Sequence, residues 1–376
     1  MEKIINQEFG GERPLYCRHD LYLENVKIHA GESALKETGN ITAVHCQFEG
    51  KYPFWECDGF VIKDSLLTVG ARSGLWYSRN CEIYDTIIDA PKTFRRMDGI
   101  KLKNVQIPGG TETFWDCRNI EVEDSVIDRA DYVFMHCENV KLTNVKLNGN
   151  YSFQYAKNVE IRNCVLNSKD SFWEAENVTV IDSVINGEYL AWYSKNLRLV
   201  RCHITETQPL CYCDDLVLED CTMGADADLA FEYSSVQATV KGHVPSIKNP
   251  RTGFIRYGSV GEIIIDENIK GPGDCRLEKA ERGAKQKTLS GILHVTKIPE
   301  RVFCWLSILL PWQTSHYKSR HQDYSYSNNA LKLNTLTTDD QHVIHHLLCI
   351  SMWRITCFLS SRQRIVFSVN QPKTVI

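Results

Sequence analysis

One eight-residue pattern recurs about every 20 residues, and it constrains the fold more than any other feature. It reads aliphatic, any residue, aliphatic, any residue, Asn or Asp, small residue, any residue, aliphatic. Clear copies are residues 21–28, 120–127, 140–147, 159–166 and 178–185. Aliphatic residues that alternate with polar ones indicate a β-strand with one buried face. Short repeats of this kind bury their apolar face by stacking on one another, so the pattern predicts a solenoid.

A second motif follows each strand: an aromatic residue, two variable residues, a small residue, a polar residue and then Asn or Gly. Residues 54–59, 114–119 and 172–177 are copies. The closing position recurs at a spacing of 19–21 residues and is occupied by Asn40, Gly59, Asn80, Gly99, Asn119, Asn139, Asn158, Asn177, Asn196, Asp215 and Ser235. Asn, Gly and Asp tolerate a left-handed backbone, so this position predicts a turn with positive φ in every coil.

These repeats predict an all-β, single-stranded, right-handed parallel β-helix of about 11 coils of 19–21 residues. Leucine-rich repeats have a similar period, but their residue order differs and no helical pattern is present here. We choose the right-handed form because crossovers between parallel strands are overwhelmingly right-handed. We expect an N-terminal cap over 1–20, β-helix repeats over 21–235, degenerate coils and a C-terminal cap over 236–285, and an atypical, partly disordered or helical tail over 286–376.

Eight of the 15 cysteines fall in the two columns of small residues within the repeat, which predicts that they are reduced and buried. They are Cys46, Cys57, Cys117, Cys137, Cys164, Cys202, Cys213 and Cys221. Cys211 and Cys213 form one C-x-C pair, which is a weak metal signal. We therefore expect neither a metal nor a cofactor.

Charge and hydropathy argue against several partners. The net charge of −4 is too small to indicate nucleic-acid binding. The beginning of the chain has no apolar stretch of signal-peptide length, so we expect a cytoplasmic protein. The most apolar later run, residues 302–312, is shorter than the ~20 residues of a membrane-spanning helix, so we expect no membrane association.

The aromatic motif also supplies candidate ligand-binding residues. Its first column is uniformly apolar and predicts a core stack, whereas Arg95 and Gln154 in the second column indicate incomplete burial. A ladder of Trp and Tyr with carboxylates suits sugar rings, since aromatic faces stack on their apolar surfaces. The same ladder also serves as a purely structural reinforcement of a solenoid. The candidates are Trp55, Glu56, Trp76, Tyr77, Trp115, Tyr155, Trp173, Glu174, Trp192 and Tyr193.

Two other functions remain alternatives to a carbohydrate-like ligand or a structural role. A glycan-active hydrolase needs two carboxylates about 5–10 Å apart. Glu56, Asp116 and Glu174 are successively three coils apart, or roughly 14 Å, which is too far. A glycan lyase needs a base beside a cation, and the best cluster is Arg95, Arg96, Asp116 and His136. A protein-interaction scaffold needs no convergent site. We favour ligand binding over catalysis, and whether the protein is an enzyme stays open.

The strand and aromatic repeats, with the opening residues 5–13 (INQEFGGER), resemble a bacterial family, domain-of-unknown-function 3737. The resemblance covers about residues 1–285. It implies a β-helix and supplies no catalytic residues. Members of that family typically end where the repeats end here, so the tail departs from the family pattern.

Overall fold

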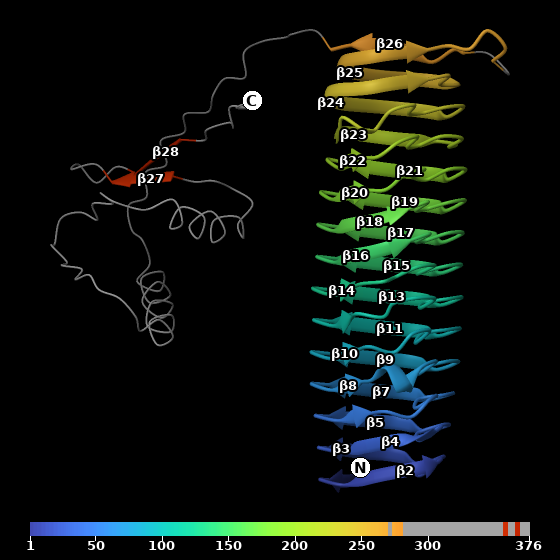
Figure 1. Ribbon diagram of the computed structural model, residues 1–376, viewed down its shortest axis with the longest axis vertical. Coiled ribbons are helices and arrows are strands. Elements are labelled where there is room, and N and C mark those ends of the chain that lie inside the picture. The colour runs from blue at the N-terminus through green and yellow to red at the C-terminus, as the bar shows by residue number, and fades with distance from the viewer. Residues whose placement is uncertain (270–272, 281–355, 360–364, 369–376) are drawn as a thin grey trace, which may run out of the picture. The chain divides into compact units, whose positions relative to one another are not determined.

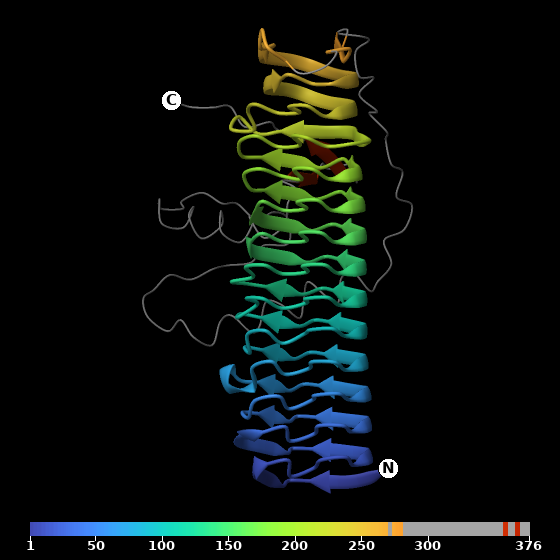
Figure 2. The same cartoon turned by 90° about the vertical axis from the view of Figure 1, so that its right-hand side faces the viewer.

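The computed structural model describes residues 1–269, 273–280, 356–359 and 365–368. Contacts divide the chain into two units, residues 1–287 and 288–376. The first unit is an all-β parallel solenoid, as the sequence pattern predicted, and it has about 14 turns instead of the expected 11. Figures 1 and 2 show it from two sides, with each coil lying directly above the one before.

One row of strands forms a parallel sheet along the rod, in which each strand pairs with those of the neighbouring coils. They are β1 (Glu2–Ile5), β3 (His19–Glu24), β5 (Gly39–Val44), β7 (Asp58–Lys63), β9 (Arg79–Tyr84), β11 (Asp98–Lys103), β13 (Arg118–Glu123), β15 (Glu138–Thr143), β17 (Lys157–Arg162), β19 (Glu176–Ile181), β21 (Lys195–Val200), β23 (Leu216–Met223), β24 (Ser235–Lys248), β25 (Thr252–Ile264) and β26 (Arg276–Lys279).

The remaining strands of the solenoid form a second parallel sheet, which β23 also joins at its end. They are β2 (Glu8–Glu12), β4 (Lys27–Glu32), β6 (Gln47–Phe48), β8 (Leu66–Leu67), β10 (Ile87–Ile88), β12 (Gln106–Ile107), β14 (Val126–Ile127), β16 (Lys146–Asn150), β18 (Val165–Lys169), β20 (Val184–Asn186) and β22 (His203–Thr205). A short 3₁₀ helix, η1 (Val69–Ala71), follows β8 in the coil whose closing positions are 21 residues apart.

The core lies inside the coils because alternate strand residues point inward and the register hardly changes. Ile120 lies opposite Val140 in the next coil, and Val140 lies opposite Val159. All three are 2% exposed or less. Like side chains therefore stack on like, which is the parallel-sheet arrangement that the aliphatic repeat encodes.

The third wall is built from turns that contain residues with a positive φ, and in the coils from Phe114 to Phe231 these are alternate residues. Glu112, Phe114 and Asp116 have φ values of 50°, 55° and 53°. Phe114 stacks on Phe134 at 4.6 Å between ring centroids, and Phe134 on Phe153 at 4.8 Å. These phenylalanines are fully buried, so the predicted core stack is confirmed.

The predicted turn with positive φ is also confirmed at the closing positions from Asn40 to Asp215, but not at Ser235, where β24 begins. The Asn side chains form a ladder, in which each amide nitrogen donates to the side-chain oxygen one coil before. Asn139 donates to Asn119 at 3.0 Å and Asn158 donates to Asn139 at 3.0 Å. The column thus fixes both the turn and the spacing of the coils.

The ends of the solenoid extend beyond the expected 11 coils. Residues 1–20, expected as a cap, contain β1 and β2, which pair with β3 and β4 and so form the first coil. Residues 236–285 include most of β24 and all of β25 and β26, which continue the sheet. The aromatic motif is missing from these coils, so the number of coils expected from the sequence was too low.

In the second unit, β27 (Thr356–Leu359) and β28 (Ile365–Ser368) pair antiparallel. These strands lie within the tail for which we expected helix or disorder, and the rest of the tail lies outside the described residues. Among the residues that the structure describes, no helix is long and apolar enough to cross a membrane.

Candidate ligand-binding face

The turn wall presents two outward rows of side chains, which we call the aromatic face. The half-buried row is Trp55, Trp76, Arg95, Trp115, Met135, Gln154, Trp173 and Trp192. The exposed row is Glu56, Tyr77, Arg96, Asp116, His136, Tyr155, Glu174 and Tyr193. The half-buried row is incompletely covered, as Arg95 and Gln154 indicated.

Both rows point outward, and the residues on either side of each outward pair point inward. In one coil, Phe114 and Cys117 are 0% and 1% exposed, and Trp115 and Asp116 lie between them. Regular strand alternation would send one of the two central residues inward. The positive φ of Phe114 and of Asp116 breaks that alternation and places two adjacent side chains on the surface.

Three of the five tryptophans in these rows, Trp76, Trp115 and Trp192, are fixed to the wall by their indole nitrogens. Nε1 of Trp76 donates to the carbonyl oxygen of Lys92 at 2.6 Å, and Nε1 of Trp192 donates to that of Gln208 at 2.8 Å. Each bond reaches the next coil, so it satisfies the polar edge of the indole and orients the ring. These residues reinforce the wall and at the same time present preorganised aromatic surface.

The cluster considered for lyase chemistry is occupied by contacts among its own neighbours. The Arg95 guanidinium lies 4.5 Å from the ring centroid of Trp76 and 4.6 Å from that of Trp115. This is a cation–π sandwich that spans three coils. The guanidinium of Arg96, in turn, lies 3.7 Å from the Asp116 carboxylate.

His136, the fourth member of that cluster, stacks on Tyr155 with 4.8 Å between ring centroids and 11° between planes. The four residues occupy adjacent coils, as expected. Their observed partners are one another, the surrounding rings and the carboxylate of Glu112, which lies 3.7 Å from the Arg95 guanidinium. The arrangement gives a continuous polar and aromatic surface.

Exposed tyrosines are concentrated on this wall. Among the described residues, the aromatic side chains more than about a third exposed are Tyr16, Tyr77, Tyr132, Tyr155 and Tyr193. All five are outward residues of the turn wall in different coils. Towards the C-terminal end, the ring of Tyr193 also stacks on that of Tyr212 at 4.9 Å.

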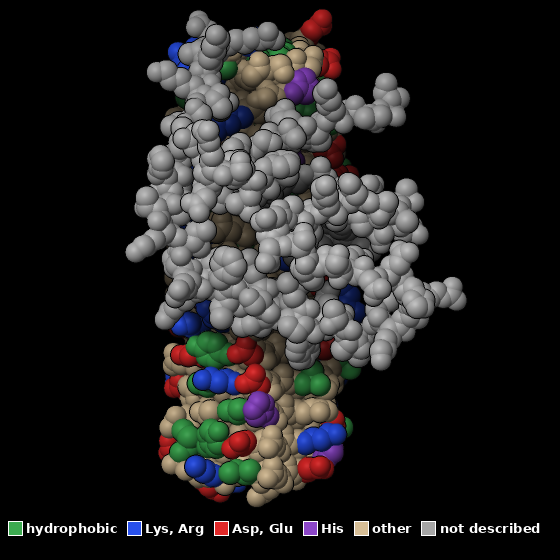
Figure 3. All heavy atoms as spheres, turned by 90° about the vertical axis from the view of Figure 1, so that its left-hand side faces the viewer, with side chains coloured by type: hydrophobic (Ala, Val, Ile, Leu, Met, Phe, Trp, Pro, Cys, Tyr) green, Lys and Arg blue, Asp and Glu red, His purple; other side chains and the backbone are tan. Residues whose placement is uncertain are grey.

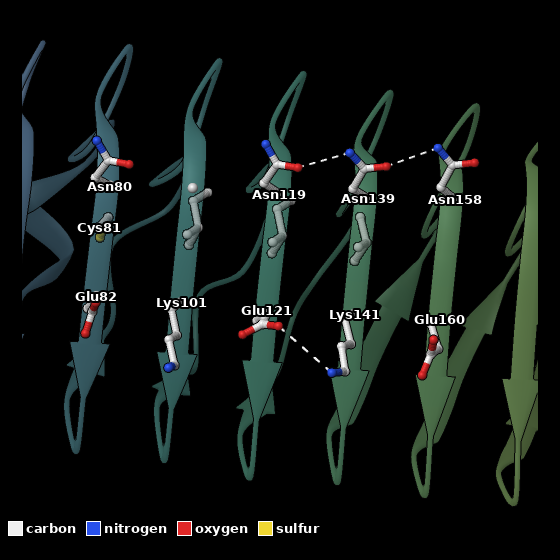
Figure 4. A pocket seen from close by; sticks show the side chains of 14 residues that line it. Asn80, Cys81, Glu82, Lys101, Asn119, Glu121, Asn139, Lys141, Asn158 and Glu160 are labelled. Carbon is white, nitrogen blue, oxygen red and sulfur yellow. Dashed lines mark hydrogen bonds and ion pairs between the residues drawn. The ribbon is translucent and has the colours of Figure 1, made fainter.

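A shallow groove of about 590 Å³ lies on a different wall, over β9, β11, β13, β15 and β17. One side is the Asn ladder and the other is a row of alternating charge, Glu82, Lys101, Glu121, Lys141 and Glu160 (Figure 4). Lys141 lies 3.9 Å from Glu121. None of the candidate residues lines this groove. Its signal in the sequence was the polar position between the two buried aliphatic residues of each strand.

Ion pairs between coils balance the charge of the surface. Lys51 lies 2.9 Å from Glu32, and Lys103 lies 3.1 Å from Glu123, each one coil apart. The coloured lower part of the rod in Figure 3 shows short rows in which acidic, basic and hydrophobic side chains lie next to one another. Such mixed rows create no strong field of one sign that would attract a highly charged partner.

The eight cysteines of the small-residue columns are all buried, at 3% exposure or less, as predicted. Burial raises the pKa of the Cys57 thiol and of the Cys164 thiol. It raises the pKa of Cys211 to about 12 and that of Cys213 to about 11. These thiols act as small apolar side chains. Within the described residues, no group of three or more His, Cys, Asp or Glu side chains is placed to hold a metal ion.

Three solved structures are similar to this chain at low identity. PfbA, a surface adhesin of Streptococcus pneumoniae, is 8% identical, and the match covers 75% of this chain and 88% of that one, with a TM-score of 0.32. A mutant of the periplasmic alginate epimerase AlgG is 10% identical, with coverages of 74% and 74% and a TM-score of 0.24. A catalytic domain of a GH87 α-1,3-glucanase is 11% identical, with coverages of 74% and 63% and a TM-score of 0.20.

Among curated proteins, no sequence matches this chain. The model of one protein family, described as protein of unknown function (DUF3737), matches residues 2–278. That range includes almost all of the described solenoid, from β1 to the third residue of β26. The chain therefore belongs to the DUF3737 family.

Proposed function

We propose that this protein is a carbohydrate-binding solenoid, which holds a glycan along its aromatic face. The observation that carries the proposal is the alignment of exposed Tyr rings and half-buried Trp rings in adjacent outward rows of one wall. Aromatic rings present flat apolar surface together with a polar edge, a combination that suits a sugar ring.

The exposed row also provides hydrogen-bonding groups beside the rings. Glu56, Asp116 and Glu174 offer carboxylate oxygens, and Arg96 and His136 offer nitrogen donors. Hydroxyl groups of a sugar both donate and accept hydrogen bonds, so such a mixed row suits a polyhydroxylated ligand. The solenoid repeats its surface once per coil, which favours a ligand that is itself a repeating chain.

Binding is preferred to catalysis because the polar groups are spread along the wall. A hydrolase needs a closely spaced pair of carboxylates, and no two carboxylates of the exposed row lie on adjacent coils between Glu56 and Tyr193. Glu37 lies one coil before Glu56, but both carboxylates are paired with the ammonium of Lys36, at 3.3 and 3.6 Å. Asp116, the carboxylate of the cluster considered for lyase chemistry, is exposed and paired with Arg96. A protein partner is the second candidate, since Tyr and Trp are also enriched at protein interfaces. A cytoplasmic location stays a prediction and would direct the search to intracellular glycans.

Titration of the full chain with neutral and acidic oligosaccharides, followed by tryptophan fluorescence, tests the proposal. We expect a saturable change with at least one class of sugar. Tyr155→Ala removes an exposed ring of the aromatic face and should weaken binding by roughly tenfold, the scale of a central aromatic contact. Tyr84→Ala is the matched control, because Tyr84 lies on β9, away from that face.

A flat response to every sugar, or equal loss of binding in Tyr155→Ala and Tyr84→Ala, would contradict the proposal. In that case, an interaction surface for another protein becomes the better explanation of the exposed rings. Trp115 is a poorer target for this test because its indole nitrogen bonds to the backbone carbonyl of Tyr132, so its removal also perturbs the wall.

A further inference from the structure

The aromatic face contains the same four-residue arrangement twice. The first aromatic unit is Trp55, Glu56, Trp76 and Tyr77, and the second aromatic unit is Trp173, Glu174, Trp192 and Tyr193. In each, a Phe-Trp-Glu sequence on one coil lies beside a Trp-Tyr-Ser sequence on the next. The residues are therefore matched in type, order and coil position.

The two units also agree in geometry. The two indoles lie 5.4 Å apart and tilted by 32° in the first unit, and 5.7 Å apart and tilted by 31° in the second. The first indole and the tyrosine ring are separated by 5.2 Å at 54° and by 5.4 Å at 56°. The second indole and that tyrosine are separated by 6.4 Å in both, at 77° and 81°.

The same backbone bond fixes both units. The second indole of each unit donates to a carbonyl oxygen 16 residues later, Trp76 to Lys92 and Trp192 to Gln208. The tyrosine of each unit is exposed, Tyr77 by 41% and Tyr193 by 44%. Each unit is therefore a rigid set of rings with one accessible phenol side chain.

The coil itself does not require this arrangement. Between the two units, the half-buried row contains Arg95, Met135 and Gln154, and the wall continues through those coils without a break. Packing alone thus accepts several residue types at these positions. What the two units share beyond wall packing is an outward set of two indoles, a phenol and a carboxylate.

We propose that the two aromatic units bind one linear glycan at two points. This inference rests on the proposed carbohydrate binding and adds the class and the minimum length of the ligand. The units are six coils apart, which at ~4.8 Å per coil is about 29 Å. A chain that reaches both units must span that distance along the rod.

The ligand is neutral. The shared set contains one carboxylate, Glu56 or Glu174, and no cation. Glu56 lies 3.6 Å from Lys36, and Glu174 lies 3.3 Å from the indole nitrogen of Trp173. Carboxylates accept hydrogen bonds from sugar hydroxyls but repel uronates, so the chemistry common to both units selects uncharged sugars.

Two-point binding predicts a specific dependence on ligand length. A short oligosaccharide binds each unit independently, so two molecules bind per chain. Once one end of a long chain is bound, the other end meets the second unit intramolecularly, at a high effective concentration. Chains longer than the spacing therefore bind with one molecule per protein and with higher affinity.

The test is calorimetric titration of the full chain with neutral gluco-oligosaccharides, from disaccharides to chains longer than the unit spacing. The variants are Tyr77→Ala, Tyr193→Ala and both together, with Tyr84→Ala as the control. We expect affinity to rise at least tenfold beyond the spanning length. Each single variant should abolish that rise and leave one short-ligand site, and the double variant should bind neither ligand.

Affinity that is independent of length, or an effect of only one of the two single variants, would overturn two-point binding while leaving carbohydrate binding in place. No binding at any length, together with binding of acidic oligosaccharides, would overturn the choice of a neutral ligand. No binding of any sugar would refute both proposals. Circular dichroism and the thermal midpoint of each variant establish that the solenoid is intact in these comparisons.

Discussion

Arg201 occupies a coil position that Asn or Asp fills in most other coils, and it keeps the same left-handed backbone, with φ of 51°. Its guanidinium donates to both carboxylate oxygens of Asp182 one coil before, at 2.6 and 2.7 Å. In the Asn columns a single hydrogen bond from a side-chain amide connects neighbouring coils. Here a bidentate ion pair has that role, which explains how a long basic residue is accepted.

This pair predicts a pH dependence of stability. The hydrogen bond from Arg201 lowers the pKa of Asp182. The folded state therefore gains stability from the ionised carboxylate above its unfolded pKa and loses it as the pH falls through the lower folded pKa. The thermal midpoint of Asp182→Asn should lie below that of the wild type at neutral pH. The gap should close below about 3.9, the ordinary pKa of an Asp carboxyl.

In an Arg201→Gln background, Asp182→Asn should have a much smaller pH-dependent effect, because the main group that lowers the pKa of Asp182 is gone and only the charge of Arg162 still lowers it. A gap that persists unchanged at acidic pH would show that Asp182 contributes through packing or backbone conformation instead. Because both side chains are about half exposed, the effect is expected to be small and to decrease with salt.

Arg95 gives a second prediction at this scale. Its guanidinium contacts two indoles and lies 3.7 Å from the Glu112 carboxylate, but its Nε is buried and has no hydrogen-bond partner among the described residues. Arg95→Ala removes both cation–π contacts and the packing between the indoles, at a cost of about 2 kcal/mol in the free energy of unfolding. Arg95→Met keeps most of the volume and removes the unpaired nitrogen, so it should cost clearly less.

Urea unfolding of the two Arg95 variants distinguishes packing from charge. Equal destabilisation by Ala and Met would mean that the cation is the dominant contribution and that filling the space between Trp76 and Trp115 adds little. Neither contact was visible in the sequence. Both contacts depend on the packing of three successive coils, which brings residues 19 and 20 positions apart in the sequence into one stack.

At the scale of the element, the turn wall depends on its internal phenylalanine stack. Phe134 is fully buried and stacks on Phe114 and Phe153. Phe134→Ala should lower the free energy of unfolding by about 3–5 kcal/mol, because neighbouring coils hold the cavity open. The backbone accepts Ala at a positive φ in this column, since Ala191 has φ of 62°.

Phe134→Leu is the matched control, because the buried Leu210 occupies the same column in another coil with φ of 64°. It should cost less than about 1.5 kcal/mol if the column can repack. Denaturant unfolding of both variants measures the difference. A cost for Leu as large as that for Ala would show that ring-on-ring stacking, and not filled volume, holds this wall together.

The strands and the closing turns could be predicted from sequence because local rules decide them. Aliphatic alternation determines which strand residues are buried, and Asn or Gly marks the turns with positive φ. The positive φ of Phe114 and Phe134 could not be predicted, because bulky residues rarely adopt it. There the stacking of neighbouring coils overrides the local preference.

The candidate site also has features that could be predicted from the sequence and features that could not. The outward aromatic rows could be predicted, since Trp and Tyr recur at fixed positions of the repeat. Which ring meets which could not, because the ring tilts and the Arg95 sandwich depend on coil-to-coil packing. The groove beside the Asn ladder was missed because its side walls belong to two columns that are each unremarkable when considered alone.

At the scale of the whole molecule, the question is whether the solenoid, whose last strand is β26, needs the tail for its stability. β26 pairs with β25, and no described residue pairs with its other edge. An open strand edge is a template for association with other chains and is usually covered or blunted. β26 is only four residues long and has a charged residue at three of its four positions, which itself discourages such pairing.

We therefore predict that deletion of residues 288–376 leaves the solenoid folded. The described hydrogen bonds of β1–β26 all have their partners within residues 1–280, and contacts divide the chain after residue 287. The stability of a solenoid is a sum over coils and their neighbours, so losing a separate unit should not change it. The thermal midpoint of the truncated chain should match that of the full chain, and light scattering should show no association.

If the truncated chain instead associates while its unfolding is unchanged, the tail acts as the cover of the β26 edge. A lower midpoint would mean that the tail contributes packing to the last coils, and the division after residue 287 would then not be a boundary of stability.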